Sequence, residues 1–300
     1  MEYCSVAETA ARWGISSRSV RNYCAAGRVP GAFLVGKTWN IPAEAEKPVR
    51  ARKAHSAPQD LLQTLRQEQA EGRKGGIYHR VQIDLTYNSN HMEGSRLTQD
   101  QTRYIYETNT LGLGEGSVNV DDIIETANHF RCVDWVIRRA KAPLTEKGIL
   151  ELHALLKGGT SDSRKQWFAV GAYKRYPNEV GGMPTTPPEE VPARMAALLA
   201  EYRAAPEKDL AALLDFHVRF ERIHPFQDGN GRVGRLILFK ECLHYGVVPF
   251  IFGDDLKFFY YRGLREWGRE NGYLTDTART AQDRFRKVLA YFRLPGGEED

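Results

Sequence analysis

The side chains best suited to chemistry gather in one short stretch, His224-Pro225-Phe226-Gln227-Asp228-Gly229-Asn230-Gly231-Arg232, with Arg235 one helical turn further on. The imidazole of His224 ordinarily titrates near neutral pH, so it is well suited to take a proton from an attacking hydroxyl. The carboxylate of Asp228 is a hard oxygen ligand of the kind that Mg²⁺ prefers. The stretch therefore combines a candidate base with a candidate metal ligand.

The same stretch has the composition of a phosphate site. Gly229 and Gly231 allow backbone conformations closed to other residues, so their N–H groups can point inward where a helix N-terminus carries partial positive charge. The side chain of Asn230 can donate to a phosphoryl oxygen. Arg232 and Arg235 are spaced i, i+3 on one helix face, so they could contact successive phosphates of a polyphosphate.

Two helices are expected to position this stretch. Apolar residues recur at helical spacing up to Ile223, and Pro225 must end that helix. A second helix is expected from Arg232 to Tyr245, with Gly246 as its C-cap. A helix-loop-helix with a merely structural histidine is the alternative, and the number of ordered polar positions disfavours it.

The run from His224 to Arg235 resembles the signature of the Fic family, H-x-F-x-[DE]-G-N-G-R-x-x-R, and matches it at every position. The resemblance implies transfer of AMP from ATP to a Ser, Thr or Tyr hydroxyl of a protein, with His224 as general base and Asp228 holding Mg²⁺. It also implies that Phe226 anchors the loop and that the glycines, the asparagine and both arginines hold phosphates. Kinase-like relatives carry a lysine at the position of Gly231, so this glycine favours nucleotidyl transfer.

A second motif, Ser89-Asn90-His91-Met92-Glu93-Gly94, matches the family's inhibitory pattern, [ST]-x-x-x-[EN]-[GN], on a helix expected over 81–93. Ser89 and Glu93 share one face of that helix. A carboxylate paired with Arg235 would occupy the group meant for the γ-phosphate, so ATP could bind only in an unproductive pose. The resemblance also allows Glu93 to position a water that removes AMP, and an ordinary surface glutamate is the remaining alternative.

Residues 167–176, with Pro177-Asn178 and Val180-Gly181-Gly182 after them, are expected to form the hairpin of the large domain. This stretch resembles the family's flap, which holds a segment of the target protein as an added strand, although a purely structural hairpin is the alternative. The resemblance implies that the nucleotide is contacted by Val180, Gly181, Gly182 and Met183. It implies that Tyr260 and Tyr261 line the pocket of the nucleobase. The other helices are expected over 61–69, 121–140, 145–157, 191–204, 256–271 and 275–292, and His153 is expected to be structural.

The N-terminal residues predict a separate small domain. A Ser5-x-x-Glu8 capping box opens a helix ending at Gly14, and a second helix runs to Gly27. Residues 33–41 then follow as a hairpin. This order resembles the winged helix-turn-helix modules of excisionases, which implies contact with DNA, whereas a protein-docking module is the alternative. The residues expected to meet DNA are Arg18, Arg21, Asn22 and Lys37.

Charge and cysteine usage limit the class of protein. Residues 1–56 contain nine Lys and Arg against four Asp and Glu, whereas the other residues contain 33 against 34, so the basic character belongs to the N-terminus. Four scattered cysteines argue against a zinc site and a disulfide framework. No apolar run is long enough to span a bilayer and no signal peptide is recognised, so the chain is expected to be soluble, cytoplasmic and without a membrane partner.

The expected fold is mainly α, with a winged helix-turn-helix over 1–45, a linker over 46–60, a Fic-type helical domain with a small β-hairpin flap over 61–293, and a tail over 294–300. The expected function is that of an autoinhibited protein adenylyltransferase that uses ATP and Mg²⁺ to modify a target protein or itself, tethered to double-stranded DNA. The alternatives are a DNA-binding transcriptional regulator whose Fic domain senses nucleotide, an enzyme that removes AMP, and use of another nucleotide. The sequence allows a homodimer.

Overall fold

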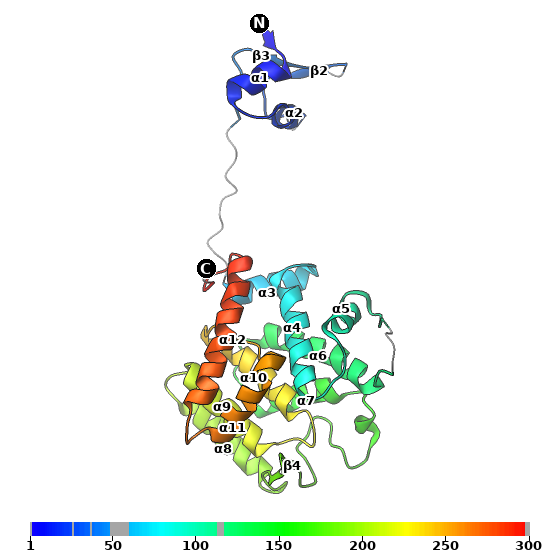
Figure 1. Cartoon of the computed structure of the whole chain (residues 1–300), viewed down its shortest axis with the longest axis vertical. Helices are drawn as coiled ribbons and strands as arrows, with labels where there is room; N and C mark the ends of the chain where they lie inside the picture. Colours follow the sequence, from blue (N-terminus) through cyan, green and yellow to red (C-terminus); the bar gives the residue numbers. More distant parts are fainter. Residues whose placement is uncertain (1, 26, 37, 49–59, 113–116, 298–300) are drawn as a thin grey trace. The chain divides into compact units, whose positions relative to one another are not determined.

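The structure is a computed structural model that describes residues 2–25, 27–36, 38–48, 60–112 and 117–297. The chain divides into two compact units, Met1–Ala57 and Pro58–Asp300 (Figure 1). The division falls within the expected linker over 46–60, most of which lies outside the described residues, as does the end of the expected tail.

The small unit combines two helices with a three-stranded antiparallel sheet of order β1-β3-β2. Its elements are β1 (Tyr3–Cys4), α1 (Val6–Trp13), α2 (Ser17–Ala25), β2 (Phe33–Val35) and β3 (Thr38–Pro42). In the sheet, Cys4 pairs with Ile41 and Leu34 pairs with Trp39. Its core consists of Val6, Ala10, Trp13, Val20, Cys24, Val29 and Ile41.

Local signals explain the helix ends of the small unit. The capping box between Ser5 and Glu8 is present, and Gly14 closes α1 with a left-handed backbone (φ 63°). The two expected helices and the hairpin are therefore confirmed as elements. β1 was not expected, because two residues carry no alternation, and the assignment as a winged helix-turn-helix stays a prediction.

The large unit is mostly helical. Its elements are α3 (Leu61–Glu71), α4 (Ile77–Met92), α5 (Gln99–Thr108), α6 (Val120–Arg139), α7 (Glu146–Lys157), η1 (Asp162–Arg164), β4 (Glu179–Val180), β5 (Met183–Pro184), α8 (Val191–Ala204), α9 (Leu210–Ile223), α10 (Asn230–Tyr245), η2 (Asp254–Leu256), α11 (Lys257–Glu266) and α12 (Gly272–Tyr291). The helix before the candidate site and the one after it, α9 and α10, are confirmed at nearly the expected bounds.

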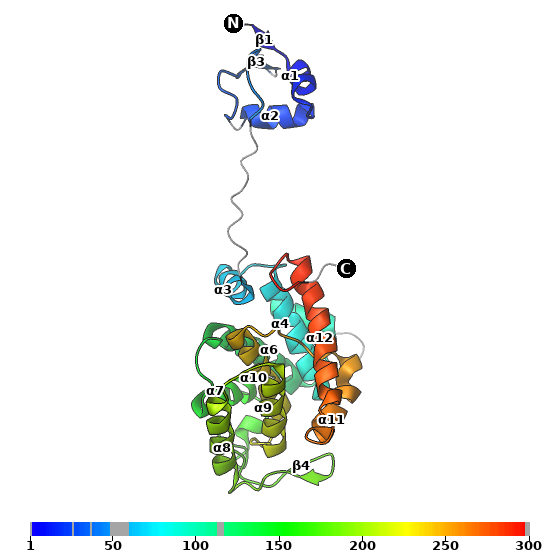
Figure 2. The same ribbon diagram turned by 90° about the vertical axis from the view of Figure 1, so that its left-hand side faces the viewer.

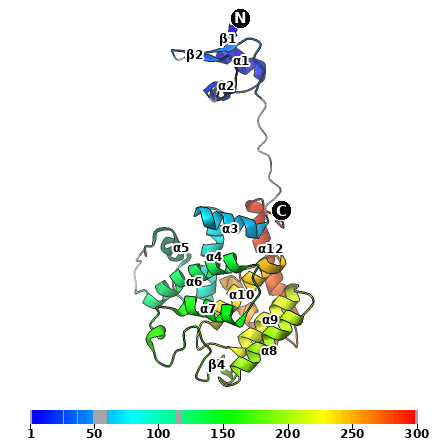
Figure 3. The ribbon, with the colours of Figure 1, turned by 180° about the vertical axis from the view of Figure 1, so that it is seen from behind.

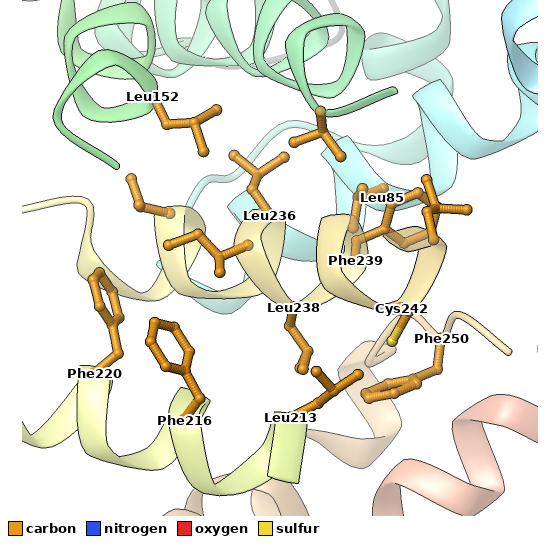
Figure 4. Close-up of a cluster of buried hydrophobic side chains, with 14 of the residues drawn as sticks. Leu85, Leu152, Leu213, Phe216, Phe220, Leu236, Leu238, Phe239, Cys242 and Phe250 are labelled. Atoms are coloured by element: carbon orange, nitrogen blue, oxygen red, sulfur yellow. The ribbon is translucent and has the colours of Figure 1, made fainter. Parts of the chain in front are cut away.

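Helix α10 lies at the centre of this unit in three views (Figures 1–3). In Figure 1, α12 lies to its left and α6 and α7 lie to its right. Every residue from Asn230 to Leu243 is buried. Figure 4 shows the reason: Leu236 points toward Leu152 of α7, whereas Leu238 points to the opposite side, toward Leu213 of α9 and Phe250. A central helix of this kind holds its first turn in a fixed place.

Two helices differ from the expected bounds for reasons of tertiary contact. α4 begins at Ile77, earlier than expected, because the buried carboxylate of Glu68 on α3 accepts from the amide of Tyr78 (2.9 Å) and caps it. α11 ends at Glu266, earlier than expected, because Arg222 donates to the carbonyl oxygens of Leu264 and Trp267 (3.1 and 2.7 Å). Contacts between distant segments therefore set both ends.

The structure confirms a hairpin only at the end of the expected stretch. Within residues 167–176 the structure has no strand, and the ladder pairs β4 with β5 around Gly181 and Gly182, whose φ angles are 58° and 77°. The reason is that amides of the earlier stretch bond elsewhere: that of Gly171 donates to His153 (2.9 Å), and that of Lys174 donates to the carbonyl of Pro225 (2.9 Å). Two consecutive residues with positive φ suit a tight two-residue turn.

The described cysteines, Cys4, Cys24, Cys132 and Cys242, are all free thiols, which confirms that no disulfide framework holds these units. Among the helices within the described ranges, none combines the length and the apolar character that crossing a bilayer requires.

Candidate active site

The loop 224–229 connects α9 to α10. His224 follows the end of α9 with a left-handed backbone (φ 52°, ψ 61°), and Pro225 prevents the helix from continuing. Phe226 is fully buried and stacks on the ring of His153, with the centroids 3.9 Å apart and the planes nearly parallel. The expected anchoring of the loop in the core by Phe226 is therefore confirmed.

Asn230 closes this loop with its side chain. The side chain accepts from the amide of Phe226 and donates to the carbonyl of the same residue, both at 2.8 Å, and Asn230 is buried. The expectation was that this side chain donates to a phosphoryl oxygen. In the structure it holds the backbone instead, so the group that Asn230 offers to an anion is its amide at the first position of α10.

The imidazole of His224 has a defined tautomer. Its Nδ1 lies 3.3 Å from the carbonyl oxygen of Glu221, which can only accept, so Nδ1 carries the proton and Nε2 keeps its lone pair. Burial lowers the pKa of His224, the hydrogen bond to Glu221 opposes this, and the charge of Lys174 lowers the pKa further. An unprotonated Nε2 near neutral pH is what a general base requires.

The N-terminus of α10 forms an anion cradle next to His224. Gly229 precedes the helix with φ 84° and, as a glycine, provides no side-chain cap. These amides carry the positive end of the helix dipole. A Cβ at Gly231 would collide with Oε1 of Glu93. The carboxylate of Glu93 therefore lies over the first turn of α10, where an anionic ligand would bind.

Arg235 and Glu93 form the pair that the sequence predicted. Nη2 of Arg235 donates to Oε1 of Glu93 (2.7 Å) and to the carbonyl of Ser89 (2.8 Å), while Nε donates to Oγ of Ser89 (3.1 Å). Arg235 and Ser89 are buried, whereas the Glu93 side chain is 28% exposed at the C-cap of α4. Burial lowers the pKa of Arg235, but Glu93 and other charges raise it above its ordinary value.

A second cluster of charges, the charge ring, consists of Asp228, Lys157, Glu125 and Arg232. Nζ of Lys157 donates to Oδ2 of Asp228 (2.6 Å) and to Oε1 of Glu125. Arg232 donates to Oε2 of Glu125 and to Oδ2 of Asp228 (3.1 Å). Burial would raise the pKa of Asp228, but Arg232 and Lys157 hold it well below its ordinary range. Asp228 is therefore ionised and oriented before any ligand binds.

The two arginines of α10 thus serve different clusters. The expectation was that Arg232 and Arg235 would face successive phosphates from one side of the helix. In the structure, Arg232 is buried in the charge ring and Arg235 turns toward α4. Of the two, only Arg235 is bonded to a carboxylate that comes from a helix end.

The β4–β5 hairpin is tied to the loop 224–229. Nδ2 of Asn178 donates to the carbonyl of Phe226 (3.1 Å), and Nζ of Lys174 donates to Oδ1 of Asn178 (2.7 Å) and Oγ1 of Thr185 (2.5 Å). Burial lowers the pKa of Lys174 to about 8. The expected contact residues of the hairpin, Val180, Gly181, Gly182 and Met183, are all exposed. The hairpin therefore presents its tip outward from an anchored base.

The two tyrosines of α11 lie in different environments. Tyr260 is fully buried, and its hydroxyl is 2.8 Å from Nε2 of His217. Tyr261 is 40% exposed, and its hydroxyl donates to the carbonyl of Met92 (3.3 Å), next to Glu93. Of this pair, Tyr261 is the one that offers ring surface near the Glu93–Arg235 pair.

In the small unit, the expected contact residues Arg18, Arg21 and Asn22 are exposed on α2. Lys37 lies outside the described residues.

Sequence reasoning missed Glu125, Lys157 and Lys174. Lys157 follows Ile149, Leu152 and Leu156 on the buried face of α7, so a cation on an apolar stripe was the available signal. Glu125 carried no such signal, because Asp121 and Asp122 also precede it on α6. Burial is what turns these charges into parts of a site.

The sequence from α7 to α10 decides which proteins this chain is similar to. Residues 143–241 match the model of the Fic/DOC family. The match includes His153, the hairpin, the loop 224–229 and Arg235, whereas Glu93 and Tyr261 lie outside it. The residues that bring the base, the cradle and the charge ring together thus come largely from the Fic/DOC region.

Curated relatives carry the name protein adenylyltransferase Fic. The chain is 29% identical to the one from Drosophila willistoni over 219 residues, which is 71% of this chain and 41% of the relative. It is 24% identical to the one from Nematostella vectensis over 184 residues, which is 60% of this chain and 42% of the relative. The chain therefore spans about two fifths of the length of these relatives.

Solved structures share the fold. A Fic domain containing signaling protein from Bacteroides thetaiotaomicron superposes with a TM-score of 0.62 at 24% identity, covering 80% of this chain and 99% of that one. Fic-1 from C. elegans superposes with a TM-score of 0.58 at 18% identity, covering 77% and 72%. The mainly helical fold is that of Fic-domain proteins.

Proposed function

We propose that the chain is a protein adenylyltransferase that transfers AMP from ATP to a Ser, Thr or Tyr hydroxyl of a protein or of itself. The observation that carries this proposal is that Nε2 of His224 is unprotonated beside an anion cradle at the N-terminus of α10. The matching Fic/DOC family model and the curated relatives named protein adenylyltransferase support the same reaction.

In the proposed reaction, each bond that forms is matched by a bond that breaks. The hydroxyl oxygen of the target attacks the α-phosphorus of ATP and gives its proton to Nε2 of His224. The bond from the α-phosphorus to the bridging oxygen breaks, and pyrophosphate leaves with the electron pair. The amides of Gly229, Asn230 and Gly231 hold the phosphates, Arg235 holds the terminal phosphate, and Arg232 acts by fixing Asp228.

Mg²⁺ fits this site through one carboxylate. The side chain of Asp228 is 47% exposed, and its contacts to Lys157 and Arg232 both use Oδ2. Mg²⁺ commonly takes one or two carboxylates and completes its shell with waters and substrate phosphates. Asp228 would hold the ion, which when bound would neutralise negative charge on the phosphates.

The β4–β5 hairpin and α11 would contact the target protein and the nucleobase of ATP. The exposed β4–β5 hairpin, from Val180 to Met183, would contact nucleotide and present an edge to an extended target segment. Tyr261 would stack on the nucleobase, and Tyr260 would support it from the core through His217.

Glu93 would inhibit the enzyme in the state that the structure describes. Its carboxylate occupies the first turn of α10 and the guanidinium of Arg235, which are the groups that the γ-phosphate needs. Ser89 fixes the other side of Arg235, so the inhibited arrangement is held by one helix. Transfer of AMP then requires that Glu93 leaves Arg235.

The test is incubation of the full chain with ATP labelled at the α-phosphate, as wild type, Glu93→Gly, and Glu93→Gly with His224→Ala. Label on protein is expected mostly in Glu93→Gly and is expected to vanish when His224 is also replaced. Absence of label in Glu93→Gly would refute the proposal. Release of AMP from labelled protein by the wild type would favour the reverse reaction. Labelling by UTP but not by ATP would mean that UTP is the nucleotide donor.

A second role, binding of double-stranded DNA by the small unit, is supported by the exposed cluster of Arg18, Arg21 and Asn22 on α2. Salt-sensitive binding to duplex DNA is expected for the wild type. In Arg18→Ala and in Arg21→Ala the salt dependence should be shallower by about one unit of slope, because each variant removes one cation that faces a phosphate. A wild type that binds no duplex at low salt would refute this role and leave protein docking as the function of the small unit.

A further inference from the structure

The charge ring surrounds the carboxylate that is proposed to hold the metal. Oδ2 of Asp228 accepts from Lys157 (2.6 Å) and from Arg232 (3.1 Å), and Glu125 joins these two cations on their other side. Lys157 comes from the last position of α7 and Glu125 from α6. Three helices thus converge on one side chain of the loop.

The charge ring has no net charge, and three of its four side chains are largely shielded from solvent. The side chains of Lys157, Arg232 and Glu125 are 2%, 5% and 12% exposed, whereas Asp228 is 47% exposed. Two carboxylates therefore face two cations, and the one side chain open to solvent is the proposed metal ligand. Asp162, at 3.4 Å from Nζ of Lys157, is a more distant partner that Lys165 also contacts.

We propose that Lys157 is a positioning residue that makes the free site a poor metal site, so that a divalent cation enters only together with the phosphates of the nucleotide. This inference rests on the proposed function, since it takes Asp228 as the metal ligand. Lys157 fixes Oδ2 and places a positive charge beside any ion that Asp228 binds. Repulsion between them must be offset by other anionic ligands.

Within the described ranges, no group of three or more His, Cys, Asp or Glu side chains is arranged to hold a metal ion. The open amides of α10, in contrast, are arranged for an anion. The phosphates that bind these amides would therefore bring the negative charge that the cation requires.

The alternative explanation is that Lys157 only stabilises the fold. The two explanations differ in what happens when its charge is removed. A structural lysine would change the stability of the chain, whereas a charge-balancing lysine would also create a metal site at Asp228 in the absence of nucleotide. Metal binding by the free protein therefore separates them.

The experiment is a titration of the full chain with Mn²⁺ alone, followed by the electron paramagnetic resonance signal of free Mn²⁺. Lys157→Met leaves the ring with one excess negative charge and is expected to bind Mn²⁺ at least about tenfold more tightly than the wild type. Lys157→Arg keeps the charge and is expected to behave as wild type. Lys157→Met with Glu125→Gln restores the balance and is expected to lose the gain.

Lys157→Met with Asp228→Asn locates the ion, since the gain must disappear with the carboxylate. Equal Mn²⁺ binding by the wild type and Lys157→Met, or no loss of the gain on adding Glu125→Gln, would overturn the inference. If Lys157→Met does not fold, Lys157→Gln takes its place, and saturable submillimolar Mn²⁺ binding by the wild type alone would also contradict it. Labelling of Glu93→Gly by ATP is independent of these outcomes and reports separately on the proposed function.

Discussion

The two arginines of α10 meet carboxylates in two different ways. Arg232 lies in the charge ring, where Glu125 is 12% exposed and comes from the second turn of α6. Arg235 meets Glu93, which is 28% exposed and lies at the C-cap of α4. Both pairs are short and buried at the arginine. They differ in how firmly the carboxylate is held.

This difference indicates that Glu125 is part of the scaffold, whereas the contact of Glu93 with Arg235 can be broken without loss of the fold. Glu125 is bonded to two cations, so its removal leaves Lys157 and Arg232 to share Asp228 as the one carboxylate of the ring. Glu93 is bonded to one, and Arg235 keeps its bonds to Ser89 when Glu93 leaves. Burial also raises the pKa of Glu221 beside Arg235 to about 8, so this neighbour is uncharged near neutral pH. On the proposed function, Arg235 would exchange Glu93 for a phosphate.

The largest expected effect comes from the same substitution made in both clusters. Glu125→Gln should destabilise the chain by about 3–5 kcal/mol, because it leaves two buried cations with one full negative charge. Glu93→Gln should cost less than Glu125→Gln, because the Glu93 side chain is 28% exposed and Arg235 keeps its hydrogen bonds to Ser89. Chemical denaturation of the wild type and of both variants measures the free energy of unfolding. Equal decreases in stability would remove the distinction between the clusters.

The next effect is expected at Gly231. A methyl group there collides with the carboxylate of Glu93, which is the far end of a flexible side chain. Gly231→Ala should therefore displace Glu93 from Arg235 while α10 stays folded, since alanine favours a helix. A crystal structure of this variant is the measurement. An intact contact between Glu93 and Arg235 would show that the carboxylate lies elsewhere than over the first turn.

The smallest effect is expected in the pH dependence of labelling by Glu93→Gly. A general base works when it is unprotonated, so activity falls as the pH drops through the pKa of His224. Burial lowers that pKa below about 6.5, the ordinary value of histidine, so activity should persist into mildly acidic conditions. Lys174 contributes to the lowering, so Lys174→Met should move the fall in activity to higher pH.

Lys174→Arg is the matched control for this shift, because it keeps the positive charge beside His224. The other charged groups that act on His224 are Glu93, which is absent from this background, and Asp228, which is unchanged. An acidic limb that stays in place in Lys174→Met would mean that the charge of Lys174 does not reach the imidazole. The shift in the profile, rather than the rate itself, is the quantity to compare.

The sequence predicted those features that local patterns determine. The caps at Ser5 and Gly14 and the end of α9 before Pro225 follow from residue types at fixed spacings. The contact between Glu93 and Arg235 was expected from the resemblance of residues 89–94 to the family's inhibitory motif. The charge ring could not be predicted in this way. Glu125 and Lys157 are 32 positions apart, and only the packing of α6 on α7 brings them together.

The hairpin shows the same limit of prediction from sequence. Residues 167–176 are rich in aromatic and apolar residues, as strands often are, but the amides of Gly171 and Lys174 bond to His153 and Pro225. A pattern of side chains does not reveal where backbone donors find their partners. The bonds of the Asn230 side chain to Phe226 could not be predicted for a similar reason, because they depend on the shape of the loop.

The most direct measurement is the intact mass of Glu93→Gly after incubation with ATP and Mg²⁺, alone and with His224→Ala added. The account predicts a mass gain of one AMP in Glu93→Gly, on a hydroxyl side chain of the chain itself or of an added protein, and no gain when His224 is replaced. A gain of a phosphate group, or an AMP adduct that forms equally without His224, would contradict it.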